Sequence, residues 1–281
     1  MKGKSKGEAG KIGVIGGSVE YTGAPYFSAI SALKVGADLV YIITTTDAAP
    51  IIKTYSPELI VYPFLNEVSA HKIPNLLNKM DVLVIGPGLG REDSTKKMIT
   101  DILNMCRTIA KPIIIDADGL YIVSKNLSLI RNYPSPGVVL TPNIKEKHHL
   151  NKALVKDDNE DLDLGSHVYV LNKGEKDEYH TELSKFRWIL NEGGSSRRAG
   201  GQGDILSGAL GTFFNWALKS KFCGNETDPA VAASVASFAA AKFTRMCNEK
   251  AFQVLGRSMT ASDMLNQIHF AFEELFENAN N

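Results

Sequence analysis

The sequence predicts an α/β protein with a doubly wound, mostly parallel sheet flanked by helices. Short apolar segments rich in Ile, Val and Leu alternate with helical segments along most of the chain. Several of these apolar segments are continuous rather than alternating in polarity, as in strands that are covered on both faces. The repeated order of strand, helix and strand indicates a sheet with helices packed on its two sides.

The elements follow in a simple order. The predicted strands are residues 12–15, 39–43, 82–85, 113–115, 138–140 and 168–171. Helices are expected between them at residues 24–35, 94–109, 119–124 and 144–154. The last third is predicted to be helical, at residues 204–218, 230–247 and 261–276, and Thr260 with Asp263 resembles a capping box. No linker divides the chain, so we expect a flexible arm at residues 1–10 and a single domain at 11–281.

The composition argues against several classes of protein. Lys plus Arg and Asp plus Glu both number 31, so bulk charge does not indicate a nucleic-acid binder. No segment reaches the ~18 apolar residues of a membrane span, and the first ten residues lack the apolar core of a secretory signal. The cysteines Cys106, Cys223 and Cys247 form no CxxC pair, so we expect reduced thiols. We expect a cytoplasmic protein, or a mitochondrial one if a targeting segment is missing.

Two polar clusters are weak candidates for metal binding. Acidic side chains crowd one short stretch, which we interpret as a solvated loop, with a cation site as the alternative: Asp157, Asp158, Glu160, Asp161 and Asp163. The adjacent pair His148 and His149 is a poor metal site, because neighbouring residues on a helix face different directions.

Three glycine-rich turns are suited to phosphate binding, because backbone N–H groups approach phosphate oxygens where side chains are absent. Residues 16–25 follow the first predicted strand but lack the Lys of a Walker loop. Residues 86–90 resemble a dinucleotide fingerprint, but Arg91 stands where the third glycine belongs. Residues 173–177 place Lys173 at the end of a strand, where ligands bind in open α/β sheets. Each turn is equally compatible with a purely structural role.

A fourth turn, residues 193–204, is more specific. It brings five glycines, two arginines and a carboxylate to the start of one predicted helix. Arg197 and Arg198 can pair with phosphate oxygens, and free N–H groups from Gly201 to Asp204 can hold a developing anion. A helix cap is the alternative role for Asp204, but the glycines and the arginine pair favour a catalytic carboxylate.

Six motifs together resemble one family. The runs GKIGVIGGSVEYTGAP, VIGPGLGRED, PIIIDADGL, VVLTPNIKE, NKGEKD and GGSSRRAGGQGDILSG occur in the order found in the ATP-dependent NAD(P)H-hydrate dehydratases. The eukaryotic, carbohydrate kinase domain-containing members are the most similar, because GSSRR followed by GGQGD is their form of the loop. The resemblance runs from about Lys6 to the C-terminal helix.

This resemblance implies a ribokinase-like fold and the repair of hydrated NADH or NADPH at the expense of ATP. Hydroxide leaves a ring poorly whereas phosphate leaves well, so phosphorylating the ring hydroxyl makes its elimination easy. Asp204 is expected to take the hydroxyl proton as general base or to orient that hydroxyl, and its place at a helix N-terminus is expected to keep it ionised. Mg²⁺ is expected with ATP, because the phosphate charge is neutralised during transfer.

The resemblance also implies where the two partners, ATP and hydrated NAD(P)H, bind. The hydrated dinucleotide is expected against Asp204, Ala24, Gly88, Gly90, Asn143, Ile144, Lys145, Glu146, Lys147, His148 and His149. ATP is expected against Lys173, Gly174, Glu175, Lys176, Asp177, Gly194, Ser195, Ser196, Arg197, Arg198, Ala199, Gly200, Gly201, Gln202 and Gly203. Asp116 belongs either to the metal–phosphate environment or to the cap of the next helix. The metal ligands stay unknown, a homo-oligomer stays open, and neither nucleic acid nor membrane is an expected partner.

Two departures from the family keep alternatives open. Lys147, His148 and His149 follow Glu146 where relatives carry an aromatic residue, and the segment between Asn143 and Lys173 is short. One alternative is a kinase of the same fold that phosphorylates a vitamin-precursor alcohol. The other is a nucleotide-binding protein that has lost catalysis. Among these, the dehydratase is the function we predict.

Overall fold

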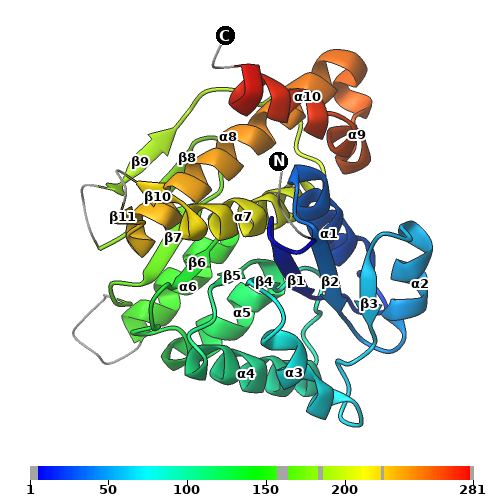
Figure 1. The fold of residues 1–281 in the computed structure, drawn as a ribbon, viewed down its shortest axis with the longest axis vertical. Coiled ribbons are helices and arrows are strands. Elements are labelled where there is room, and N and C mark those ends of the chain that lie inside the picture. Colours follow the sequence, from blue (N-terminus) through cyan, green and yellow to red (C-terminus); the bar gives the residue numbers. More distant parts are fainter. Residues whose placement is uncertain (1–5, 157–163, 183–185, 223–224, 279–281) are drawn as a thin grey trace.

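The centre of the protein is a nine-stranded sheet, seen in a computed structural model that describes residues 6–156, 164–182, 186–222 and 225–278 (Figure 1). The strand order is β3-β2-β1-β4-β5-β6-β7-β8-β9. Neighbours are parallel from β3 across to β7, and β8 and β9 continue the sheet antiparallel. The strands are β1 (Lys11–Ile15), β2 (Leu39–Ile43), β3 (Ile60–Tyr62), β4 (Val82–Ile85), β5 (Ile113–Ile115), β6 (Val138–Leu140), β7 (Val168–Asn172), β8 (Asp177–His180) and β9 (Trp188–Leu190).

Helices cover both faces of the sheet and create two cores. One core holds side chains from α1 (Gly23–Val35), α2 (Ala48–Tyr55), α7 (Gln202–Lys219), α8 (Pro229–Leu255), α9 (Ala261–Asn266) and α10 (Ile268–Phe272). The other holds side chains from α3 (Ile73–Leu77), α4 (Asp93–Thr108), α5 (Ala117–Lys125) and α6 (Ile144–Lys156). Within β4, Val82 and Val84 enter the first core whereas Leu83 and Ile85 enter the second. This two-sided burial explains the continuous apolar strands and confirms the predicted fold class.

The elements that the sequence analysis missed are short or polar. Strand β3 has three residues, β8 reads Asp-Glu-Tyr-His, and β9 is only partly buried. Helices α2 and α3 were also missed, and β10 (Lys221–Phe222) with β11 (Asn225–Glu226) forms a separate hairpin. The single helix predicted at 261–276 was wrong, because α9 ends at Asn266, α10 begins at Ile268, and a π-helical turn, Glu273–Glu277, follows α10. The capping box of Thr260 and Asp263 is confirmed.

Part of the predicted N-terminal arm is held by hydrogen bonds, and the described cysteines are free. In the predicted arm, the N–H groups of Gly7 and Ala9 donate to the Asp38 carboxylate at 2.8 and 2.9 Å. Cys106 and Cys247 are free and buried. Cys223 and the acidic stretch at 157–163 lie outside the described residues. No described helix is long and apolar enough to cross a bilayer.

The parallel strands bring the predicted turns to one edge of the sheet. Strands β1, β4, β5, β6 and β7 all end there, and they are followed by Gly16, Gly86, Asp116, Thr141 and Lys173. The chain leaves β1 towards β2 and β3, and then returns to β4 on the other side of β1. Ligands bind at such a switch point in open α/β sheets, so this edge is where a site is expected.

Candidate active site

A charged cluster forms where β5, β7 and α7 meet. The Nζ atom of Lys173 lies 2.5 Å from Oδ1 of Asp116, whose side chain is 2% exposed. Asp204 lies beside them in the first turn of α7, where a Cβ added to the preceding residue, Gly203, would be 3.1 Å from the Lys173 Nζ. Three elements that are distant in the sequence thus bring one ammonium and two carboxylates together.

The carboxylates and the ammonium of this cluster shift one another's pKa. Burial lowers the pKa of Lys173, but the charges of Asp116, Glu146 and Asp204 together raise it above its ordinary value. Burial and the Asp116 charge raise the pKa of Asp204 well above that of an ordinary Asp, although Lys173 opposes them. Desolvation and like charge therefore raise the pKa of Asp204 against the helix N-terminus, which was expected to keep this carboxylate ionised.

The N-terminus of α7 offers backbone donors beside this cluster. The first intrahelical bond runs from the Ile205 N–H to the Gly201 carbonyl at 3.0 Å, so the N–H groups of Gln202, Gly203 and Asp204 precede the helical ladder. Gly201 has a φ of 94°, and an added Cβ would contact Phe27 and Ala261. Glycine is thus required at Gly201 by both conformation and space. The result is a bare backbone surface that faces an ammonium group.

Arg245 of α8 ties two predicted ATP turns together; we call residues 173–177 and 193–203 the α8-side turns. Its Nε donates to the buried Asp177 carboxylate at 2.6 Å. Its other nitrogens donate to the carbonyls of Gly174, Glu175 and Gly193 at 3.3, 2.7 and 3.1 Å. Asp177, predicted to contact ATP, has its carboxylate occupied by Arg245 and by the Gly174 N–H, so its direct role is to shape the turn.

A second α8 residue, Asn248, holds the arginine-bearing part of the same turns. Its Oδ1 accepts from the Ser195 N–H at 2.6 Å, and its Nδ2 donates to the Arg197 carbonyl at 3.3 Å. Gln202 also donates to that carbonyl, and Arg198 donates to Gly174 at 3.1 Å. Within the described residues, the buried Nε of Arg197 has no partner. Arg197 therefore retains an unused hydrogen-bond donor in this turn.

The other predicted turns, residues 16–25 and 86–90, are the switch-point turns, and backbone contact holds them. The Gly17 N–H donates to the Pro87 carbonyl at 2.9 Å. A Cβ on Gly86 would collide with the Asp116 carbonyl oxygen, and one on Gly88 would lie 2.6 Å from the Tyr21 carbonyl and 3.2 Å from Ala24. The predicted ligand residues Gly88 and Ala24 therefore pack on one another.

Gly90 differs from its neighbours because space remains beside it. An added Cβ there would meet only Ser18, at 3.6 Å. The Ser18 hydroxyl is buried and has no partner among the described residues. The Gly90 N–H and the Arg91 Nε both donate to the Asp118 carboxylate at 3.1 Å. Ser18 was not predicted from the sequence, since a lone serine in a glycine turn carries no signal.

The TPN-x-x-E run forms a capping box at the start of α6. Asn143 Oδ1 accepts from the N–H groups of Lys145 and Glu146 at 2.9 and 3.1 Å, and the Glu146 carboxylate accepts from the Asn143 N–H at 2.8 Å. Burial, together with the Asp116 charge, raises the pKa of Glu146 against the opposing effect of Lys173. Ile144, Lys145, His148 and His149 are exposed. Of the seven residues at 143–149 that were predicted to line the substrate, Glu146 lies at the charged cluster.

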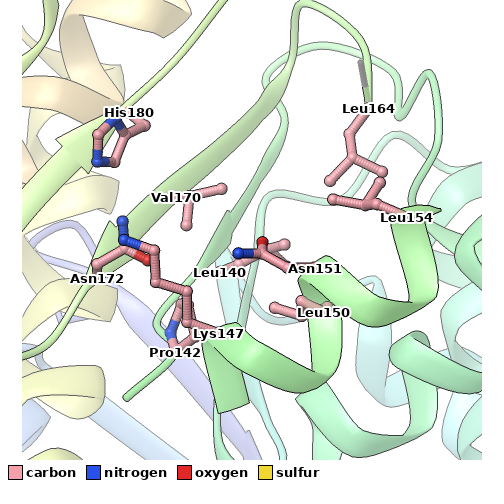
Figure 2. Close-up of a pocket in the computed structure, with 10 residues that line it drawn as sticks. All are labelled: Leu140, Pro142, Lys147, Leu150, Asn151, Leu154, Leu164, Val170, Asn172 and His180. Atoms are coloured by element: carbon pink, nitrogen blue, oxygen red, sulfur yellow. The ribbon is translucent and has the colours of Figure 1, made fainter. Parts of the chain in front are cut away.

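Lys147 lines a cavity of about 250 Å³ between α6 and the strands β7 and β8 (Figure 2). Leucines of α6 and Val170 form its apolar wall, and Lys147, Asn172 and His180 supply its polar groups. Lys147 pairs with Glu178 at 3.4 Å. Asn172 Oδ1 is buried without a partner among the described residues. Asn172, which precedes Lys173 in the chain, lines this cavity, but the residues of the charged cluster, Asp116, Lys173 and Asp204, do not.

Metal ligation by protein side chains alone finds no support in the described residues, which contain no group of three His, Cys, Asp or Glu side chains placed to hold an ion. Asp116 caps α5, because its carboxylate accepts from the Ala117 N–H at 2.9 Å. The capping role that the sequence left open is thus confirmed. Because the cap and the pair with Lys173 both use Oδ1 of Asp116, its Oδ2 remains a potential metal ligand.

The missed residues of the site share a reason. Arg245 and Asn248 lie one turn apart in the middle of the long helix α8, far in sequence from the turns they hold. Two polar residues at spacing i, i+3 are a weak signal in a part of α8 that also carries Lys242, Glu249 and Lys250.

The chain is similar to known proteins over nearly its whole length. A family model described as NAD(P)H-hydrate dehydratase matches residues 12–269. The ATP-dependent (S)-NAD(P)H-hydrate dehydratase of Aedes aegypti is 47% identical over 283 residues, covering 98% of this chain and 81% of the relative. The Homo sapiens protein of that name is 45% identical over 288 residues, with 98% and 80% covered.

Solved structures share the fold. A ribokinase-like superfamily protein from Enterococcus faecalis has a TM-score of 0.73 at 19% identity, covering 98% of this chain and 90% of that one. The ADP/ATP-dependent NAD(P)H-hydrate dehydratase from Bacillus subtilis, co-crystallised with ATP/Mg²⁺, has a TM-score of 0.69 at 19% identity, with 98% and 92% covered. The ribokinase-like fold is confirmed, and on the family model and the sequence relatives the chain belongs to the NAD(P)H-hydrate dehydratase family.

Proposed function

We propose that the site at Asp204 dehydrates hydrated NADH and NADPH, as the S epimer, back to the reduced cofactors while ATP becomes ADP and phosphate. The protein is then a lyase of metabolite repair, as its family membership indicates. The observation that carries the proposal is the placement of the Asp204 carboxylate beside Lys173 and the open N-terminus of α7. A base, a cation and backbone donors therefore converge where a phosphoryl group can be received.

The reaction has two steps. Asp204 accepts the proton of the ring hydroxyl, whose oxygen attacks the γ-phosphorus while the bond to the β–γ bridging oxygen breaks and ADP leaves. The carbon–oxygen bond of the phosphorylated ring then breaks. Phosphate departs with the bonding electrons, and a proton leaves the neighbouring ring carbon to restore the double bond. A positioned general base contributes about 10²–10⁴-fold to such a step.

Lys173 and the α7 backbone would stabilise the phosphoryl group in transit. The N–H groups of Gln202, Gly203 and Asp204 have no intrahelical acceptor, and the Lys173 ammonium lies against Gly203. Removing one such donor typically costs about 10²–10³-fold in rate. Arg197, whose Nε lacks a partner within the described part of the chain, supports the prediction that the α8-side turns hold ATP.

The donor set fits Mg²⁺ carried by ATP. Mg²⁺ is usually held by one or two carboxylates together with substrate phosphates and waters. Asp116 retains one carboxylate oxygen beyond its bonds to Lys173 and Ala117, and Asp204 lies beside it. Asp116 would hold the ion together with phosphate oxygens and water, and the ion would neutralise phosphate charge.

The proposal is tested by incubating the purified protein with hydrated NADH and either ATP or ADP, and following the absorbance of reduced nicotinamide. We expect ATP-dependent recovery of NADH with release of phosphate. Accumulation of a phosphorylated alcohol in place of NADH would identify the kinase alternative. Binding of ATP without turnover would identify a protein that has lost catalysis.

Substitution of the base and a pH profile examine the mechanism. Asp204→Asn should bind ATP normally and lose about 10²–10⁴-fold in kcat.

Because burial and the Asp116 charge raise the pKa of Asp204, wild-type kcat/KM should rise with pH through a value well above the pKa of an ordinary Asp. Asp116→Asn removes a charge that raises this pKa, so its acid limb should move to lower pH. If the acid limb of the profile does not move in Asp116→Asn, that limb reports the ionisation of a group other than Asp204.

A further inference from the structure

A second pocket, of about 200 Å³, lies between α5 and α6 and is unusually basic. Tyr121 and Lys125 line it from α5, and His149 and Lys152 line it from α6. The two helices pack against each other. Within the described residues, neither Lys125 nor Lys152 pairs with a carboxylate. The pocket therefore presents two lysine charges that no described acidic group neutralises.

Further cations surround the tyrosine of this pocket. The Arg91 guanidinium lies 4.5 Å from the Tyr121 ring centroid, Lys125 Nζ lies 5.2 Å from it and Lys96 Nζ lies 5.8 Å from it. Arg91 also pairs with Asp118 at 3.1 Å, and Lys96 pairs with Asp93 at 2.8 Å. Cations that converge on one ring repel each other, and the ring attracts each of them only weakly at an exposed position. An anionic ligand would relieve that repulsion.

The pocket is connected to the charged cluster by one face of each helix. On α5, Asp118, Tyr121 and Lys125 are spaced i, i+3 and i+7, so they share a face. On α6, Glu146 and His149 are similarly spaced i, i+3, with Lys152 one turn further on. Both stripes begin at the sheet edge that carries the charged cluster, since Asp116, the partner of Lys173, caps α5 and Asn143 caps α6 shortly after β6 ends. At about 1.5 Å per residue, Lys125 lies roughly 10 Å along α5 from Asp118.

We propose that this basic pocket binds the phosphates of the hydrated dinucleotide, so that the nicotinamide ring reaches Asp204 while the phosphorylated remainder lies between α5 and α6. The inference rests on the proposed function, because it uses the same substrate. A dinucleotide carries its phosphates beyond the ribose that follows the nicotinamide, so the cations must stand away from the reacting carbon. Two phosphate sources share this chemistry: the diphosphate, common to NADH and NADPH, and the 2′-phosphate, found in NADPH alone.

The test uses Lys125→Gln/Lys152→Gln and a control with the same change in charge, Lys6→Gln/Lys79→Gln. Both control lysines are exposed, and Lys79 precedes β4 at the opposite edge of the sheet. NADPH and NADH, the products, are titrated into each variant by calorimetry in the presence of ADP. We expect the Kd for NADPH to rise about fivefold in the pocket variant, the size expected of two exposed charge pairs, and to stay unchanged in the control. Added salt should shrink the difference.

The titrations with NADPH and NADH distinguish the two phosphate sources, and they also show which results would reject the inference. A loss for NADPH alone supports a 2′-phosphate site, and an equal loss for both products supports a diphosphate site. Unchanged affinities for both, or a loss matched by the control, would overturn the inference. A loss of ATP affinity of the same size would also overturn it, by assigning the pocket to ATP. Because product binding is measured without turnover, an inactive wild-type protein would reject the proposed function but still report on the pocket.

Discussion

The two pairs of turns around the charged cluster are held in place by different means. In the switch-point turns, backbone meets backbone: the Gly17 N–H bonds to the Pro87 carbonyl, and Gly86 leaves no room for a Cβ beside Asp116. In the α8-side turns, side chains of one helix bridge the gaps, chiefly through Arg245 and Asn248. The switch-point turns therefore depend on glycines, whose lack of a side chain permits close backbone contact. The α8-side turns depend instead on side chains that are distant in the sequence.

This difference predicts distinct sensitivities, and the largest effect is expected at Arg245. Arg245→Met removes the partner of the buried Asp177 carboxylate and three further hydrogen bonds to carbonyls of the α8-side turns. Breaking a buried ion pair by removing one partner lowers the free energy of unfolding by about 3–5 kcal/mol. Chemical denaturation measures this loss, and an ATP titration should show a raised KM.

A neighbouring pair on the same helix supplies the control. Lys242 pairs with Glu192 at 3.1 Å, but Glu192 is 74% exposed. Lys242→Met should therefore change stability by less than about 1 kcal/mol. Equal effects of the two substitutions would mean that Arg245 does not hold the turns. Adding Asp177→Leu to Arg245→Met should recover stability without recovering ATP affinity, because the uncompensated charge is gone while the turns stay untied.

The next largest effect tests the switch-point turns. Gly86→Ala places a Cβ against the Asp116 carbonyl at a φ of 134°, so it should lower the free energy of unfolding by about 1–3 kcal/mol or more. Because the carbonyl it strikes belongs to the partner of Lys173, turnover should fall as well. Gly200→Ala is the control for the loss of stability, since an added Cβ there meets nothing within 4 Å. Similar losses from both alanines would contradict a steric role for Gly86.

The same contrast explains how much the sequence could predict. The parallel core was predictable because its strands are covered on both faces and read as continuous apolar runs, as in Val82–Ile85. The catalytic turn was predictable because glycines, arginines and Asp204 are adjacent in the chain. The hairpin of β8 and β9 was missed because β8 reads Asp-Glu-Tyr-His and therefore offers no apolar run. Arg245 was missed because a tertiary hydrogen bond from mid-helix leaves no local pattern.

The raised pKa of Asp204 was unpredictable for a related reason. Local sequence places the carboxylate at a helix N-terminus, which favours its ionised form. The opposing effects, burial and the Asp116 charge, come from packing against a strand end nearly ninety residues earlier, a separation evident from the numbering. A motif thus specifies which group acts, whereas the assembled sheet edge specifies its protonation.

The smallest effect is expected at the capping box, which belongs to neither pair of turns. Asn143→Ala removes the acceptor for two N–H groups at the start of α6 and should lower the free energy of unfolding by about 1 kcal/mol. If Asn143 only caps α6, KM for the hydrated dinucleotide should stay at the wild-type value. If it also contacts that substrate, as the family resemblance implies, KM should rise while Asn143→Asp, which retains a capping oxygen, keeps the stability. Stability therefore reports on the cap of α6, because Asn143→Asp keeps a capping oxygen, whereas KM reports on a contact between Asn143 and the substrate.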